Sequence, residues 1–241
     1  MNKDNILFGV IGLLLGLIIG FVFANNINQR GPTAVFTPGA QQQPNQALPP
    51  DHPAVPGGGG AGGAQGGPDM QAVQEAINLA KTETNNFDAQ MKAADYTYQI
   101  QRYDDAIQFL TRANQLKPDS YEAVVNLGNV NFDAGRYQEA EKWYTAALKT
   151  KPDDVNVRTD LGLTFYFRTP PDVDRAIKEY RASLAIDPNH VQTLQNLVVA
   201  LTKKGDAAEA RAALTKLEGV SPNNPAVARL RSDLEALGTA K

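Results

Sequence analysis

Four segments of this sequence repeat one another, and the repeat leaves few folds open. They run over residues 102–120, 136–154, 172–190 and 206–224, and each carries an alanine with a large apolar residue four positions later. Each has a proline two residues before its end, and these prolines are Pro118, Pro152, Pro188 and Pro222, at spacings of 34, 36 and 34 residues. This period is the length of a helix–turn–helix unit that buries its apolar face against neighbouring units. The sequence therefore predicts an all-α solenoid of about ten helices, with no sheet.

A partner helix precedes each repeated segment. The clearest two, residues 121–135 and 155–168, carry Leu127-Gly128 and Leu161-Gly162 at the same place. A glycine has no Cβ, so it lets the two helices of a unit approach closely. Packing offsets the roughly 1 kcal/mol of helix propensity that glycine forfeits.

These positions resemble the tetratricopeptide repeat (TPR), whose pattern is W-x2-L-G-x2-Y … A-x3-F … P over 34 residues. The matching residues of the two middle units are Leu127, Gly128, Ala140, Tyr144 and Pro152, then Leu161, Gly162, Phe165, Ala176, Tyr180 and Pro188. The resemblance implies a right-handed solenoid of antiparallel helix pairs. It implies four repeats, at 87–120, 121–154, 155–190 and 191–224, with capping helices at 69–86 and 225–241.

Three departures from the family pattern mark the outer and third repeats. The first repeat has Ala93-Ala94 and the last has Leu197-Val198 where Leu-Gly is expected, so both are divergent. Terminal repeats are often atypical. The third repeat carries two extra residues in its turn, around Thr169-Pro170-Pro171.

The resemblance also implies a binding groove, because the first helix of each TPR pair lines the concave face. Tyr166 and Phe167 would point toward this groove and anchor a peptide, unless they pack against the neighbouring unit. The basic residues of a carboxylate clamp are missing, so the expected partner is a protein or peptide client held by apolar and amide contacts. The predicted groove residues are Glu122, Val125, Asn129, Phe132, Asp133, Asn156, Thr159, Leu163, Tyr166, Phe167, Gln192, Gln195 and Val199.

Residues 6–24, after a short tail at 1–5, form an uncharged apolar run that spans roughly 28 Å as a helix. This predicts a single transmembrane anchor, with the repeats on the extracytoplasmic side. The alternative is a signal peptide cleaved after Ala24, which would release a secreted or periplasmic module. Gly12, Gly16 and Gly20 share one helix face, an arrangement that allows close helix pairing and homo-oligomers in lipid, although glycine is common in membrane helices.

Residues 25–68 are rich in Pro, Gly and Gln and predict a disordered linker. As a flexible coil, such a linker has a root-mean-square reach of about 35 Å. This composition favours a simple spacer. The alternative is a Pro-rich recognition motif, but the segment has no PxxP next to a basic residue.

Composition argues against catalysis. The chain has no cysteine, only His52 and His190, and a formal net charge of −3. Metal and acid–base sites draw heavily on His and Cys, so we expect no enzyme, no cofactor, no metal and no nucleic acid. The predicted function is a membrane-anchored TPR adaptor that holds a client protein during assembly, export or maturation of another complex.

Overall fold

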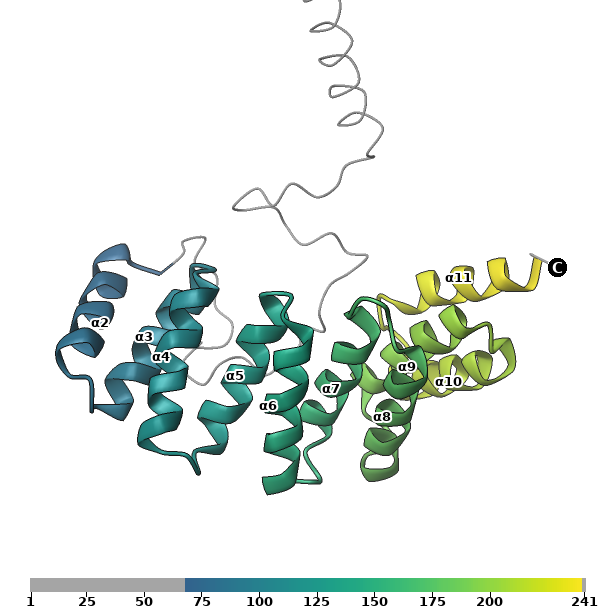
Figure 1. Ribbon diagram of the computed structural model, residues 1–241. Helices are drawn as coiled ribbons and strands as arrows, with labels where there is room; N and C mark the ends of the chain where they lie inside the picture. The colour runs from purple at the N-terminus through teal and green to yellow at the C-terminus, as the bar shows by residue number, and fades with distance from the viewer. Residues whose placement is uncertain (1–67, 240–241) are drawn as a thin grey trace, which may run out of the picture. The chain divides into compact units, whose positions relative to one another are not determined.

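The computed structural model describes residues 68–239, and these residues form ten α-helices and no strand (Figure 1). The prediction of an all-α repeat is confirmed for this part of the chain. In chain order the helices are α2 (Met70–Thr82), α3 (Phe87–Gln99), α4 (Tyr103–Leu116), α5 (Tyr121–Asp133), α6 (Tyr137–Thr150), α7 (Val155–Phe167), α8 (Val173–Ile186), α9 (Val191–Lys204), α10 (Ala207–Val220) and α11 (Val227–Thr239).

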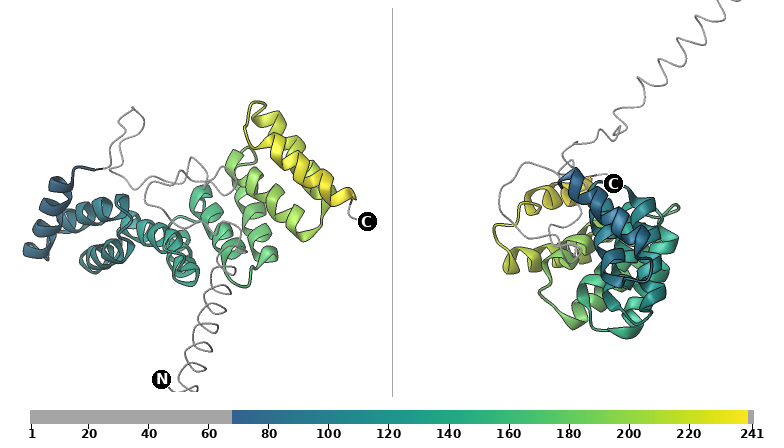
Figure 2. Two further views of the ribbon diagram at one scale, coloured as in Figure 1. Left: turned by 90° about the horizontal axis from the view of Figure 1, so that it is seen from above. Right: turned by 90° about the vertical axis from the view of Figure 1, so that its left-hand side faces the viewer.

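Each helix packs against the next one in the chain, so the ten helices form a stack (Figures 1 and 2). The four repeats are the pairs α3–α4, α5–α6, α7–α8 and α9–α10, with α2 before them and α11 after them. Contacts between helices that are not consecutive join α7 to α9 and α9 to α11. Each repeat therefore depends mainly on its immediate neighbours, as expected of a solenoid.

Short polar side chains start most of these helices. Ser120 accepts a hydrogen bond from the amide of Ala123, and Asp154 accepts one from the amide of Val157 at 3.0 Å. Such a bond satisfies an amide that has no partner within the helix. The other helices that begin with a side-chain cap are those after Asp69, Asn86, Asp172 and Asp206.

The turn inside three of the four pairs has the same left-handed backbone. Gly135 and Gly205 have φ of 72° and 87°, and Gln101 has φ of 59° at the equivalent place. This region suits glycine, because a Cβ clashes with the following carbonyl. The third pair differs, since its longer turn contains the Thr169–Pro170 cis peptide bond.

A glycine–tyrosine contact closes each of the two middle pairs. A Cβ added at Gly128 would lie 2.5 Å from Cε1 of Tyr144, and one at Gly162 would lie 2.7 Å from Cδ1 of Tyr180. Both tyrosines are fully buried. The close helix approach predicted from the Leu-Gly pairs is therefore made by an aromatic ring lying directly on the glycine.

The first repeats share a core with the N-terminal helix. Val73 and Ile77 of α2 belong to one buried cluster with Leu110 of α4 and Leu127 of α5, and Trp143 of α6 lies partly buried against this cluster. The helix α2 thus covers the apolar end of the first repeat.

None of the helices between residues 68 and 239 is both long and apolar enough to cross a membrane. The predicted membrane helix at 6–24, with Gly12, Gly16 and Gly20, and the linker before residue 68 lie outside the described residues.

Candidate functional site

The predicted groove residues lie on α5, α7 and α9, the first helices of repeats 2 to 4, and they differ widely in exposure. Glu122 and Asn156 are exposed. Those that are partly exposed are Asp133, Tyr166, Phe167, Gln192, Gln195 and Val199. The amide of Gln195 donates to Oδ1 of Asn224 at 2.8 Å, which holds this side chain against the last turn of the array.

Five of the predicted groove residues are buried instead of accessible. Their exposed fractions are 8% for Val125, 1% for Asn129, 5% for Phe132, 1% for Thr159 and 5% for Leu163. The reason is that α5 and α7 each pack against helices on both sides, so little of their circumference is left open. These five side chains therefore lie beneath the surface of the predicted groove. A partner would contact the more exposed groove residues beside them.

Asn129 shows how such a residue is used internally. Its Oδ1 accepts a hydrogen bond of 2.9 Å from the hydroxyl of Tyr144, the ring that lies on Gly128. Burial raises the pKa of Tyr144 well above its ordinary value, and the carboxylates of Asp160 and Asp133 raise it further. The tyrosine therefore stays protonated and acts as a hydrogen-bond donor.

Thr159 and Asn156 belong to a polar network that joins three helices, with Thr159 in its buried part and Asn156 at its exposed end. The hydroxyl of Thr159 lies 2.6 Å from that of Thr193 and 3.1 Å from that of Ser183. His190 reaches Thr193 through Nδ1 at 2.6 Å and Asn156 Oδ1 through Nε2 at 3.0 Å. Because Oδ1 only accepts, Nε2 of His190 donates the hydrogen bond to Asn156. His190 thus has a structural role between repeats 3 and 4.

A cluster of aromatic rings lies where the first helices end and the second helices begin. Phe167 is its centre: its ring centroid lies 6.0 Å from that of Phe132, 6.4 Å from that of Tyr137 and 5.2 Å from that of Tyr166. Tyr98 and Tyr103 form the equivalent contact of the first repeat, at 6.0 Å. We call these six residues the aromatic edge, and all of them except Phe132 are partly exposed.

Phe167 shows the packing predicted as one alternative, and its role as a peptide anchor stays a prediction. It packs on Phe132 and Tyr137 of the preceding repeat, and it remains partly exposed. The ammonium of Lys203 lies 4.8 Å from the ring centroid of Tyr166, so a cation from the next repeat covers that ring.

Asp133 is the acidic member of this edge. Its carboxylate accepts a hydrogen bond from the hydroxyl of Tyr98. Burial raises the pKa of Tyr103 and that of Tyr137, and the nearby charge of Asp133 raises both further. At neutral pH both hydroxyls are therefore protonated and can act as hydrogen-bond donors.

The sequence analysis missed Tyr98, Tyr103 and Tyr137. Tyr103 and Tyr137 follow an arginine at the start of two repeated segments, so their shared position was the available indication. Among the residues that the structure describes, no three His, Cys, Asp or Glu side chains group as metal ligands would. The arrangement offers rings, hydroxyls and amides, which suit contact with a polypeptide.

A family model for the tetratricopeptide repeat matches residues 99–159 and 172–234, just over half of the chain. The chain belongs to the tetratricopeptide repeat family. The predicted resemblance is confirmed in this respect, and proteins of this kind act in general as protein-interaction scaffolds.

Solved structures of other TPR proteins share the fold. A MamA crystal structure is 24% identical with a TM-score of 0.57, over 63% of this chain and 81% of that one. MamA from Desulfovibrio magneticus RS-1 is 18% identical with a TM-score of 0.59, over 65% and 87%. YrrB, described as a TPR protein with an unusual peptide-binding site, is 16% identical with a TM-score of 0.58, over 68% and 83%. No curated protein matches this chain.

Proposed function

We propose that this TPR scaffold binds a client polypeptide along its aromatic edge while residues 6–24 hold it at a membrane. The observation that carries the proposal is the row of partly exposed rings that crosses the ends of three first helices. Aromatic side chains are the most frequent anchors of protein interfaces, because they bury a large area at a small entropy cost.

The client is proposed to be a polypeptide with apolar anchors and backbone groups available for hydrogen bonds. Tyr137 and Phe167 offer ring faces, and exposed Glu122 and Asn156 lie on the same two repeats. The peptide-binding site described for YrrB supports the choice of a polypeptide over a small molecule.

The proposed anchor and linker would set where the client is held. A coil of some 40 residues between residue 24 and α2 has a reach of about 35 Å, which would keep a bound client close to the bilayer. Confinement of this kind raises the effective concentration of client and membrane components to the millimolar range. The role in assembly, export or maturation of another complex rests on this layout.

The binding proposal can be tested by site-specific photocrosslinking in native membranes. A photoreactive residue at Tyr137 is expected to capture one discrete partner, whereas the same residue at exposed Arg211 on α10 should not. Combining Tyr166→Ala with Phe167→Ala should abolish the crosslink from position 137. An unchanged crosslink in this double variant would remove the aromatic edge as the binding surface.

The anchor is tested separately by fractionation. The intact chain should remain in the membrane pellet after alkaline carbonate washing and keep its original N-terminus. Recovery in the supernatant with an N-terminus at Asn25 would replace the anchor with the cleaved-signal alternative.

A further inference from the structure

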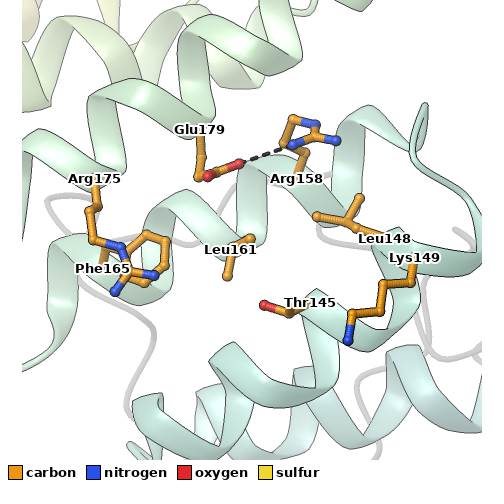
Figure 3. Close-up of a pocket in the computed structure, with 8 residues that line it drawn as sticks. All are labelled: Thr145, Leu148, Lys149, Arg158, Leu161, Phe165, Arg175 and Glu179. Atoms are coloured by element: carbon orange, nitrogen blue, oxygen red, sulfur yellow. Dashed lines mark hydrogen bonds and ion pairs between the residues drawn. The ribbon is translucent and has the colours of Figure 1, made fainter.

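A second surface lies away from the aromatic edge, between the second helices of repeats 2 and 3. It is a pocket of about 340 Å³, formed by α6, α7 and α8 (Figure 3). Its volume falls in the range of ligand-binding pockets. Its lining residues are Thr145, Leu148, Lys149, Arg158, Leu161, Phe165, Arg175 and Glu179.

The pocket lies beside a position where the chain departs from the family pattern. The TPR pattern places Trp three residues before the Leu-Gly pair, and in the third repeat Arg158 stands three residues before Leu161. In the fourth repeat, Leu194 fills the equivalent position and is buried. Arg158, whose side chain is 20% exposed, stands at this position in the third repeat and lines the pocket.

The pocket and the predicted groove are on opposite sides of α7. At 100° per residue, Arg158, Leu161 and Phe165 lie on a stripe centred roughly 150° from the stripe of Thr159 and Leu163. A ligand in the pocket would therefore leave the aromatic edge free, and this inference is independent of the proposed function.

The floor of the pocket is apolar and its walls are mostly cationic. Leu161 and Phe165 are buried beneath it, and the guanidinium of Arg175 lies 3.8 Å from the ring centroid of Phe165 (Figure 3). Lys149 is exposed and has no hydrogen-bond or ion-pair partner among the described residues. Glu179 is the one carboxylate among the lining residues, and Glu141 of α6, outside the lining, pairs with Arg175 at 2.7 Å.

Arg158 is not fully used by its own neighbours. Its Nη1 contacts Glu179 at 3.1 Å and its Nη2 donates to the carbonyl of Pro152 at 2.7 Å. Its Nε is buried and has no hydrogen-bond partner. A buried donor without an acceptor costs about 1–3 kcal/mol, so Arg158 is held here at some cost in stability.

We propose that this pocket binds an acidic, apolar-containing segment of a partner protein. A carboxylate of the segment pairs with Lys149, because Glu179 and Glu141 already match Arg158 and Arg175 and leave Lys149 as the unpaired cation of the lining. An adjacent leucine or phenylalanine side chain of the segment fills the space above Leu148, Leu161 and Phe165, in place of the missing indole.

The proposal is tested with the full-length protein in mild detergent and a fluorescein-labelled peptide, Gly-Ser-Asp-Leu-Glu-Phe-Glu-Ser-Gly. Two matched peptides replace either its acids by amides or its Leu and Phe by Ser. Loss of a charge-assisted hydrogen bond costs about tenfold or more in affinity, so fluorescence anisotropy should show the parent peptide binding at least about tenfold tighter than both.

Variants assign the binding to the pocket. Lys149→Glu should weaken binding at least about tenfold, whereas Lys216→Glu, the same charge change at an exposed lysine of α10, should not. Arg158→Trp combined with Glu179→Gln fills the pocket and should abolish binding while circular dichroism shows an intact fold. Tyr166→Ala with Phe167→Ala should leave this binding unchanged, which separates it from the proposed client site.

Three results would overturn the proposal. The first is equal binding of the amide peptide. The second is full binding to Lys149→Glu. The third is equal binding of the peptide that lacks Leu and Phe, together with competition by inorganic phosphate, which would reduce the pocket to a site for simple anions.

Discussion

Replacing Gly128 with alanine tests how tightly the middle repeats are packed. The added Cβ would lie 2.5 Å from Cε1 and 2.6 Å from Cδ1 of Tyr144, about 1 Å inside ordinary contact. The ring has little freedom to move, since Tyr144 is fully buried and its hydroxyl is tied to Asn129. One methyl group must therefore displace either an aromatic ring or a whole helix.

The expected magnitude follows from two opposing effects. Overpacking of a dense core costs typically about 1–3 kcal/mol, and breaking the Tyr144–Asn129 hydrogen bond adds about 1 kcal/mol. Alanine recovers about 1 kcal/mol through its better helix propensity. The net loss is about 1–3 kcal/mol, which lowers Tm by roughly 2–4 °C per kcal/mol in a domain of this size.

Differential scanning calorimetry would measure this change, and Gly219 supplies the matched control. Gly219 also lies in a helix, but a Cβ there would have nothing within 4 Å. Gly219→Ala should therefore raise Tm slightly, by the propensity gain alone. Gly162→Ala should behave like Gly128→Ala, because its Cβ would meet the buried ring of Tyr180. A rise in Tm for Gly128→Ala equal to that for Gly219→Ala would refute the reasoning.

Three further predictions follow from the turns, the buried tyrosines and the polar network. Gly135→Ala and Gly205→Ala should each cost about 1 kcal/mol in urea unfolding, because both φ values are positive; unchanged midpoints would contradict this. Tyr144 and Tyr180 have raised pKa values, chiefly through burial. Their contribution to stability is complete below pH about 10 and declines as pH rises above it, since the unfolded state then loses protons first. Ultraviolet titration should show both ionising only on alkaline unfolding, and ionisation in the folded chain would argue against their burial. Thr159→Val should cost about 1–3 kcal/mol in the same urea assay, by leaving polar partners in the network unsatisfied; a neutral result would mean that the network relaxes freely.

The helix pairs could be predicted from the sequence because their determinants are local. Gly128 and Tyr144 occupy family positions sixteen residues apart, and a repeating pattern records such short-range packing directly. The burial of Asn129 and Thr159 could not be predicted in the same way. It depends on how far the neighbouring repeats close over α5 and α7, and this is decided by contacts between units.

The candidate surfaces show the same limit. Tyr137 belongs to repeat 2 and its ring stacks on that of Phe167 in repeat 3. A sequence pattern within one repeat does not predict a contact between two repeats. The pocket beside Arg158 was equally hidden, although the missing tryptophan is visible in the sequence. Its walls come from three helices, and an arginine at that position could have folded over the gap.

The packing of each helix on its chain neighbours has a mechanical consequence. A solenoid of this kind has no single central core that unfolds as one unit. One weakened interface between neighbouring repeats can therefore open while the other repeats stay folded. The rings of Phe132, Tyr137 and Phe167 bridge the seam between repeats 2 and 3. A polypeptide bound across these rings would hold repeats 2 and 3 together. It would have to dissociate before the two repeats could be pulled apart.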